Sequence, residues 1–293
     1  MSDHAQHYFV PQPSHWMIVG SFALLFMAGG AAMWFNGAEF GRWGVLVGFA
    51  LLVLMMFRWF GDVVRESESG KYGKWEDVSF RWGMSWFIFS EVMFFAAFFG
   101  ALFYARVLSV PDLASLTSRE LLWPDFSAHW PSAGPGFTEQ FTPMGAWGIP
   151  ALNTLLLLSS GVTLTIAHFG MVDGNRAKLK LWLFLTIALG VIFLGFQVYE
   201  YSHAYSELNL KLSTGIYGTT FFMLTGFHGF HVTIGVIMLT TMLFRSIAGH
   251  FKPQQHFAFE AVAWYWHFVD VVWLFLFFCI YWWGAGKAPI ALH

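Results

Sequence analysis

Arg81 and Arg106 enclose the stretch of this sequence that most constrains its fold. The 24 residues between them, from 82 to 105, are apolar or uncharged except for Glu91. A hydrocarbon core of about 30 Å requires about 20 helical residues, so this stretch predicts a membrane-spanning helix. At ~1.5 Å per residue, Glu91 lies roughly 15 Å along the helix from Arg81, near the middle of the membrane.

An acidic residue at that depth needs a specific environment. Insertion costs about 2.5–3.5 kcal/mol even on a lenient scale, and the neighbouring phenylalanines cannot solvate a carboxylate. Glu91 must therefore face protein or a water-filled cavity. Two interpretations stay open: a neutral carboxyl that makes a hydrogen bond in helix packing, and a functional carboxyl linked to protons.

The composition is that of a membrane protein. Hydrophobic residues make up 57% of the chain and charged residues 11%, against about 25% charged residues in soluble domains. The net charge of −2 argues against a nucleic-acid partner. The single cysteine, Cys279, lies in an apolar run and excludes a disulfide framework or a thiolate metal cluster.

The apolar segments predict an all-α integral membrane protein with seven spans. We expect the spans at about 16–35, 43–60, 82–105, 150–169, 179–201, 218–244 and 259–283. The chain then divides into a short N-terminal tail with a two-helix hairpin (1–65), a cytoplasmic linker (66–80) and a five-helix bundle (81–293). A loop at 107–148 holds five of the ten prolines, so we expect irregular structure there.

Lysine and arginine predict the orientation of the chain. Ten lie on one side of the seven spans and five on the other, and the richer side should be cytoplasmic. The N-terminus is then inside, the C-terminus outside, and the loop at 107–148 faces outward. The ten are Arg58, Arg65, Lys71, Lys74, Arg81, Arg176, Lys178, Lys180, Arg245 and Lys252, and the five are Arg42, Arg106, Arg119, Lys211 and Lys287.

Two polar pairs recur at helical spacing. His228 and His231 are three residues apart and share a helix face, as do His267 and Asp270. They could ligate haem, copper or zinc, but no complete ligand set of known spacing is visible. We therefore expect no metal in this chain, and hydrogen bonds from these histidines to buried carboxyls or to the backbone.

Glu91 should be neutral in its apolar surroundings and donate a hydrogen bond to His228 or His231. Ser85 and Ser90 are the only other polar candidates along its helix, and they do not make a proton wire. We therefore expect Glu91 to modulate activity and not to act as an essential relay.

A further cluster carries the chemistry of phospholipid headgroup binding. Tryptophan and arginine at a membrane boundary contact the lipid carbonyls and phosphate, respectively. Plain positive-inside topology is the alternative. The residues of this cluster are Arg58, Trp59, Arg65, Glu66, Arg245 and His250.

Four sequence strings resemble the subunit III family of the cytochrome c oxidases, which are haem–copper terminal oxidases. They are RWFGDVVRES, FIFSEVMFFAAFF around Glu91, TGFHGFHV, and FEAVAWYWHFVDVVWLFLFFCIYWWG. The resemblance covers nearly the whole chain in the right order. It implies a V-shaped arrangement, with the hairpin and the bundle as arms and phospholipids in the cleft between them.

The resemblance also implies roles for single residues. Glu91 matches a buried carboxyl that reacts with carbodiimides. From the residues themselves, we expect His228 and His231 to be its proton-linked neighbours, His267 and Asp270 to be structural, and no residue of this chain to be catalytic. Phe60 stands where relatives often have a second tryptophan, and Ala248 where some have a basic residue. The implied lipid-binding positions are Trp59, Phe60, Arg65, Glu66, Arg245 and His250.

The implied function is that of a non-redox accessory subunit that supports oxygen reduction and proton uptake or pumping and protects against turnover inactivation. Haem and copper belong to partner subunits I and II, with subunit I as the main contact, and a supercomplex with the cytochrome bc complex is a further expected association. Seven spans favour cytochrome c as electron donor of the complex, because the similar quinol-oxidase subunit typically lacks the first two spans.

We expect the protein in the bacterial cytoplasmic membrane in preference to the mitochondrial inner membrane. An independent carrier or channel, suggested by Glu91 and the histidines, is the alternative.

Overall fold

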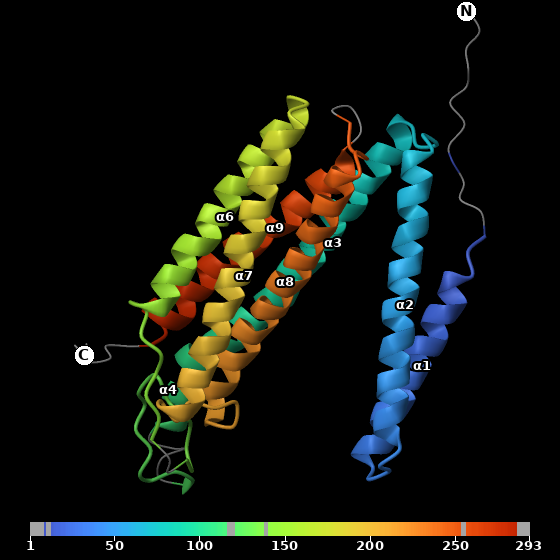
Figure 1. The fold of residues 1–293 in the computed structure, drawn as a ribbon. Helices are drawn as coiled ribbons and strands as arrows, with labels where there is room; N and C mark the ends of the chain where they lie inside the picture. Colours follow the sequence, from blue (N-terminus) through green and yellow to red (C-terminus); the bar gives the residue numbers. More distant parts are fainter. Residues whose placement is uncertain (1–8, 10–12, 116–120, 138–139, 253–255, 286–293) are drawn as a thin grey trace, which may run out of the picture. The chain divides into compact units, whose positions relative to one another are not determined.

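The computed structural model describes residues 9, 13–115, 121–137, 140–252 and 256–285. Within these residues, seven helices are long and apolar enough to cross a membrane, which confirms the all-α fold with seven spans. Arg119 and Lys287 of the charge count, and most of the N-terminal tail, lie outside the described residues. The seven helices are α1 (Trp16–Phe35), α2 (Gly41–Glu68), α3 (Lys74–Phe103), α6 (Ile149–Val172), α7 (Arg176–Ser206), α8 (Gly215–Ile247) and α9 (Phe257–Leu276) (Figure 1).

Several helices extend beyond their apolar segments. Helix α2 continues to Glu68 and α3 begins at Lys74. The expected linker (66–80) is therefore mostly helical, and only residues 69–73 lie between the two helices. The length of an apolar segment matches the thickness of the hydrocarbon core, whereas the helix that contains it can continue into the headgroup layer and water. Glu76 and Asp77 in the first turn of α3 favour this start, because they face the positive end of the helix dipole.

The outward end of α3 also extends further than expected. It continues through a π-helical segment, η1 (Tyr104–Ser109), and a short helix, α4 (Val110–Leu113), so helical structure covers the first part of the expected loop. Pro111 lies in the first turn of α4, directly after η1, and its missing N–H removes one backbone hydrogen bond to the preceding helical turn.

The chain divides into two compact units, Met1–Arg81 and Trp82–His293. In the first unit, α1 and α2 form an antiparallel hairpin (Figure 1). Glycines let the two backbones approach closely. A Cβ on Gly30 would lie 2.6 Å from the Val45 backbone nitrogen, and one on Gly48 would lie 2.6 Å from the Ala23 carbonyl oxygen. The hairpin is therefore held by close backbone packing, as expected for small residues in membrane helices.

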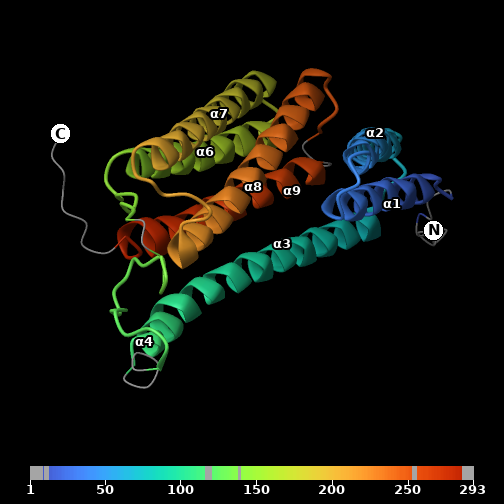
Figure 2. The same cartoon turned by 90° about the horizontal axis from the view of Figure 1, so that it is seen from below.

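In the second unit, α6, α7, α8 and α9 contact one another in sequence, and α9 returns to contact α6 (Figure 2). Trp266 of α9 is fully buried at the centre of this group. A Cβ on Gly190 of α7 or on Gly235 of α8 would lie 2.8 Å and 2.7 Å, respectively, from the Trp266 ring. One indole thus fills the space that two glycines leave on neighbouring helices.

The two buried indoles of α9 also fix its position against α6. Trp266 Nε1 donates to Ser160 Oγ, and Trp273 Nε1 donates to Thr154 Oγ1, each at 2.9 Å. In an apolar medium, an unpaired indole N–H would cost free energy, so these bonds select the rotation of α9.

Helix α9 also ends in a π-helical segment, η2 (Phe277–Trp282). Arg106, in η1 of α3, donates to the Trp283 carbonyl oxygen at 2.8 Å, and its guanidinium lies 3.6 Å from the centre of the Trp283 ring. The two widened turns are thereby joined at one end of the unit.

Candidate functional site

Glu91 of α3 and His231 of α8 form a polar contact inside the second unit. Glu91 Oε2 lies 2.8 Å from His231 Nε2. Of the two histidines named from the sequence, it is therefore His231 that contacts Glu91. The Glu91 side chain is 21% exposed and that of His231 is 10% exposed, so the pair lies near the outside of the unit.

The contact of the second ring nitrogen of His231 limits the protonation states that the Glu91–His231 pair can adopt. Nδ1 lies 2.6 Å from the Phe227 carbonyl oxygen, which can only accept, so Nδ1 carries a proton. Nε2 then either accepts from a neutral Glu91 or, in an imidazolium, donates to a carboxylate. The two arrangements hold the same number of protons and differ in the position of one proton along the hydrogen bond.

Aromatic rings surround the pair. The rings of Phe94, Phe95 and Tyr265 lie 5.9, 5.0 and 6.4 Å, respectively, from the His231 ring, centre to centre. These rings come from α3 and α9, so three helices enclose the contact. Their apolar faces favour the arrangement with fewer charges.

The other histidines named from the sequence also have partners. His228 is fully buried, and its Nε2 donates to the Val269 carbonyl oxygen at 3.1 Å. His267 Nδ1 lies 3.5 Å from Asp270 Oδ2, one turn further along α9. These contacts match the expected pattern of hydrogen bonds to backbone and carboxyls. They do not bring the four residues into one ligand set.

A second buried carboxyl lies in the same unit. Glu200 of α7 is fully buried, and its Oε1 accepts a hydrogen bond from the Tyr281 hydroxyl at 2.6 Å. The sequence shows Glu200 as a polar residue within a span, but Glu200 and Tyr281 are 81 positions apart and no sequence pattern pairs them.

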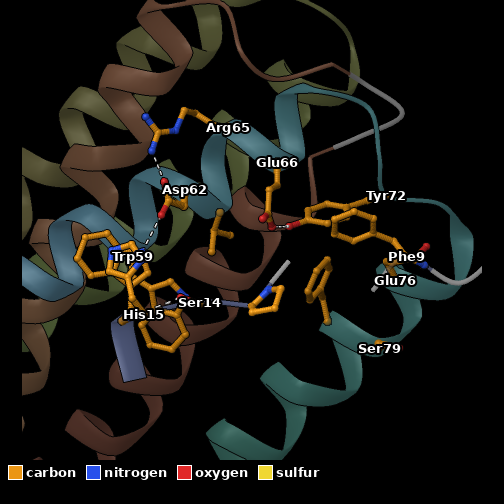
Figure 3. Close-up of a pocket in the computed structure, with 14 residues that line it drawn as sticks. Phe9, Ser14, His15, Trp59, Asp62, Arg65, Glu66, Tyr72, Glu76 and Ser79 are labelled. Atoms are coloured by element: carbon orange, nitrogen blue, oxygen red, sulfur yellow. Dashed lines mark hydrogen bonds and ion pairs between the residues drawn. The ribbon is translucent and has the colours of Figure 1, made fainter. Parts of the chain in front are cut away.

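The first unit contains a cavity of about 450 Å³ (Figure 3). Three of the six residues expected near lipid, Trp59, Arg65 and Glu66, line it, and Phe60 is not among the lining residues. Arg245 and His250 belong to the second unit.

The cavity walls are rich in carboxylates. Asp62 pairs with the Arg65 guanidinium (Figure 3). It also accepts a hydrogen bond from Trp16 Nε1 at 2.7 Å. Glu66 accepts from the Tyr72 hydroxyl at 2.9 Å. Burial, and then the hydrogen bond to Glu66, raise the pKa of Tyr72 to about 12, so its hydroxyl remains a donor at neutral pH. The sequence named Arg65 and Glu66 but missed Asp62, Trp16 and Tyr72 as their partners.

Arg245 lies at the end of α8. Its guanidinium carbon is 4.6 Å from the centre of the Phe251 ring, and its carbonyl oxygen accepts from the His250 backbone N–H at 3.1 Å. The two residues expected near lipid in this unit are thus neighbours in one turn.

Among the described residues, one group of three side chains could hold a metal ion: His168, His256 and Glu260. Their candidate ligand atoms all lie within 4.8 Å of one another. None of the three was expected from the sequence as a metal ligand, and His168 is there simply a polar residue within the expected span 150–169. The signal that could have found them is the spacing of four residues between His256 and Glu260 across the first turn of α9.

The fold and these contacts define a multi-pass helical membrane protein that holds paired polar groups within its spans, Glu91 with His231 and Glu200 with Tyr281. The model of the cytochrome c oxidase subunit III family matches residues 4–285 of this chain. The chain therefore belongs to the cytochrome c oxidase subunit III family, which confirms the resemblance seen in its motifs.

Relatives of known identity extend over the same length. Cytochrome c oxidase subunit 3 of Loxodonta africana is 41% identical over 286 residues, which cover 97% of this chain and 100% of the relative. The subunit 3 of Scyliorhinus canicula is 42% identical with the same coverage, and that of Petromyzon marinus is 41% identical. Family membership implies association with the other subunits of cytochrome c oxidase, a proton-translocating oxidoreductase of the respiratory chain.

Proposed function

We propose that this chain is a non-redox accessory subunit that supports oxygen reduction and proton uptake or pumping by the catalytic subunit and protects the complex during turnover. The observation that carries this proposal is the Glu91–His231 contact at 2.8 Å within a membrane span. In the neutral arrangement Glu91 donates to Nε2, which lowers the cost of a carboxyl at this depth. His228 lies three residues away on the same helix and supports the polar character of this region.

A modulating role fits the contacts along α3. Ser90, the residue next to Glu91, donates its hydroxyl proton to the Phe87 carbonyl oxygen at 2.6 Å. It is therefore committed to the helix backbone and does not extend a chain of proton carriers from Glu91. The proton of the pair can move between Glu91 and His231 without leaving the contact, which suits local adjustment better than transport.

Glu91→Gln in the complete oxidase tests this proposal. The amide can donate to His231 Nε2 as the neutral carboxyl does, so we expect an assembled complex, most of the oxygen reduction, and a modest loss in proton uptake or in lifetime under turnover. Glu207→Gln is the matched control, because Glu207 pairs with His203 at 3.2 Å and is exposed. Loss of all oxygen reduction in Glu91→Gln, with haems and assembly intact, would require a direct catalytic role instead.

We further propose that the subunit binds structural phospholipids. The cavity of the first unit supports this, because it combines the indole of Trp59 with the Arg65 guanidinium near a membrane boundary. Arg65 already pairs with Asp62, so a lipid phosphate would have to share this guanidinium. His250 and Arg245 remain candidates for a second headgroup contact, and Phe60 for contact with acyl chains.

The proposed partners follow from the family. Subunit I, which bears haem, is the main contact, subunit II holds copper and receives electrons from cytochrome c, and a supercomplex with the cytochrome bc complex is a further association. An absorption spectrum of the purified assembly tests this set against an independent carrier, because a carrier would purify without haem.

We propose the bacterial cytoplasmic membrane as the location, with the N-terminus cytoplasmic and the C-terminus periplasmic. The lysine and arginine bias motivates this orientation. In intact cells, an impermeant thiol reagent should label a cysteine introduced within 126–136 but not Ser69→Cys. Labelling with the opposite pattern would reverse the orientation.

A further inference from the structure

His168, His256 and Glu260 meet where the end of α6 lies beside the start of α9. His168 is in the last turns of α6, His256 immediately precedes α9, and Glu260 is in its first turn. His256 Nε2 lies 3.0 Å from Glu260 Oε1, and the two imidazole rings are 5.5 Å apart, centre to centre. All three are near helix ends, and hence near the membrane boundary and not at mid-membrane.

His168 retains an unused ligand atom. Its Nε2 is buried and has no hydrogen-bond partner among the described residues. A buried imidazole nitrogen without a partner costs free energy, and a bound cation would remove that cost. This distinguishes the group from the exposed His203–Glu207 pair, which has the same spacing but no third ligand in the described part of the chain.

The surroundings hold these groups in position. Arg176, at the start of α7, donates to the carbonyl oxygens of Gly249 and Phe251 at 3.2 and 2.9 Å, which holds residues 249–251 against the start of α7. The Phe259 ring lies 5.6 Å from the His168 ring, centre to centre. The side chains of His256 and Glu260 are 12% and 15% exposed, so an ion could reach them from the boundary.

The donor set selects a class of metal. Two imidazoles and one carboxylate match three-ligand zinc sites, which leave a fourth position for water or another ligand. Calcium and magnesium prefer oxygen ligands and are disfavoured. Ligand atoms of tetrahedral zinc are about 3.4 Å apart, so the present spread of up to 4.8 Å requires only side-chain rotation.

We propose that His168, His256 and Glu260 form a zinc-binding site that joins the end of α6 to the start of α9. This site is separate from the Glu91–His231 contact and carries no redox chemistry. The sequence-based expectation of no metal rested on the histidines of α8 and α9 and did not consider this group. A bound ion would replace the direct His256–Glu260 contact and link the end of α6 to the start of α9.

The test measures zinc in the complete purified oxidase. The complex is stripped with a chelator, equilibrated with increasing free Zn²⁺, and its bound zinc is determined by mass spectrometry. Wild type should bind one equivalent more than His168→Ala, and Glu260→Gln should weaken that equivalent at least tenfold. His203→Ala is the matched control and should bind as wild type, and millimolar Mg²⁺ should not displace the ion.

Haem content and co-purification of the subunit verify assembly in each variant. Glu260→Gln keeps the shape of the side chain, so it tests the site even where His168→Ala fails to assemble. Equal zinc content and affinity in wild type and Glu260→Gln would overturn the proposal, as would an extra equivalent that disappears in His203→Ala. Neither result bears on the role of Glu91, which Glu91→Gln tests separately.

Discussion

The hairpin of the first unit and the helix group of the second solve the same problem of membrane insertion differently. Over the most apolar 18 residues of each span, 17% of α1 and 11% of α2 are buried, against 28% to 56% of the helices α6 to α9. The hairpin is joined through glycine backbone contacts and directs its large side chains outward. The second unit buries tryptophans, histidines and carboxyls and pairs their polar atoms. Close backbone packing is thus enough to join two helices, whereas buried polar side chains need several helices around them to supply their partners.

The largest effect should come from removing the indole at the centre of the second unit. Trp266→Ala deletes a fully buried ring and its bond to Ser160, and we expect a loss of about 3–5 kcal/mol in stability. Trp43→Ala is the control in the hairpin, because Trp43 is 60% exposed, and its effect should stay within about 0.5 kcal/mol. Thermal unfolding of the purified complex measures both. Equal losses would remove the distinction between the units.

An intermediate effect should follow from unpairing a buried histidine. Glu91→Ala leaves His231 Nε2 without its partner and opens a cavity, so we expect a loss of about 1–3 kcal/mol and a lower yield of assembled complex. Glu91→Gln should retain most of the yield. Quantitative blotting of the membrane-assembled oxidase compares them, and similar yields for the two variants would mean that the contact contributes little.

Arg65→Ala should have the smallest effect on stability, but it should change the phospholipid content of the complex. Arg65 lines the cavity of the first unit and is 78% exposed, so the fold should be nearly unaffected. Tightly bound phospholipid should decrease, and the enzyme should inactivate sooner under turnover. Arg42→Ala at the other end of the same helix is the control, since Arg42 does not line the cavity. Unchanged phospholipid by mass spectrometry in Arg65→Ala would count against lipid binding at this position.

The apolar runs were sufficient to predict the seven spans, because membrane insertion depends on composition summed along a helix. They did not predict where α2 ends or where α3 begins, since Glu68 and Lys74 lie in water-facing turns that remain helical without being apolar. Hydropathy marks the lipid-embedded part of a helix and gives no information on how far the helix continues.

The partners of buried polar groups were harder to predict. Spacing put His228 and His231 on one helix face, but the rotation of α8 against α3 decides which of them contacts Glu91, and packing fixes that rotation. The contact between His168 and His256 joins residues 88 positions apart (256 − 168) with no local pattern. Such pairs arise only when helices distant in sequence come together.

The link between Arg106 and Trp283 has a consequence for insertions and deletions. A π-helical turn holds one residue more than an α-helical turn, and α3 and α9 each carry such a turn at the ends that this arginine joins. Deleting one residue within η1 would turn that segment into regular α-helix and leave α3 and α4 in nearly the same rotational phase, because the wide turn already absorbs the extra residue. Deleting one residue from the regular part of α3 between Glu91 and Arg106 would instead rotate one of them by about 100° relative to the other, so that both could not face their partners. The span should therefore tolerate a change of length in its π-helical turn better than in its α-helical part.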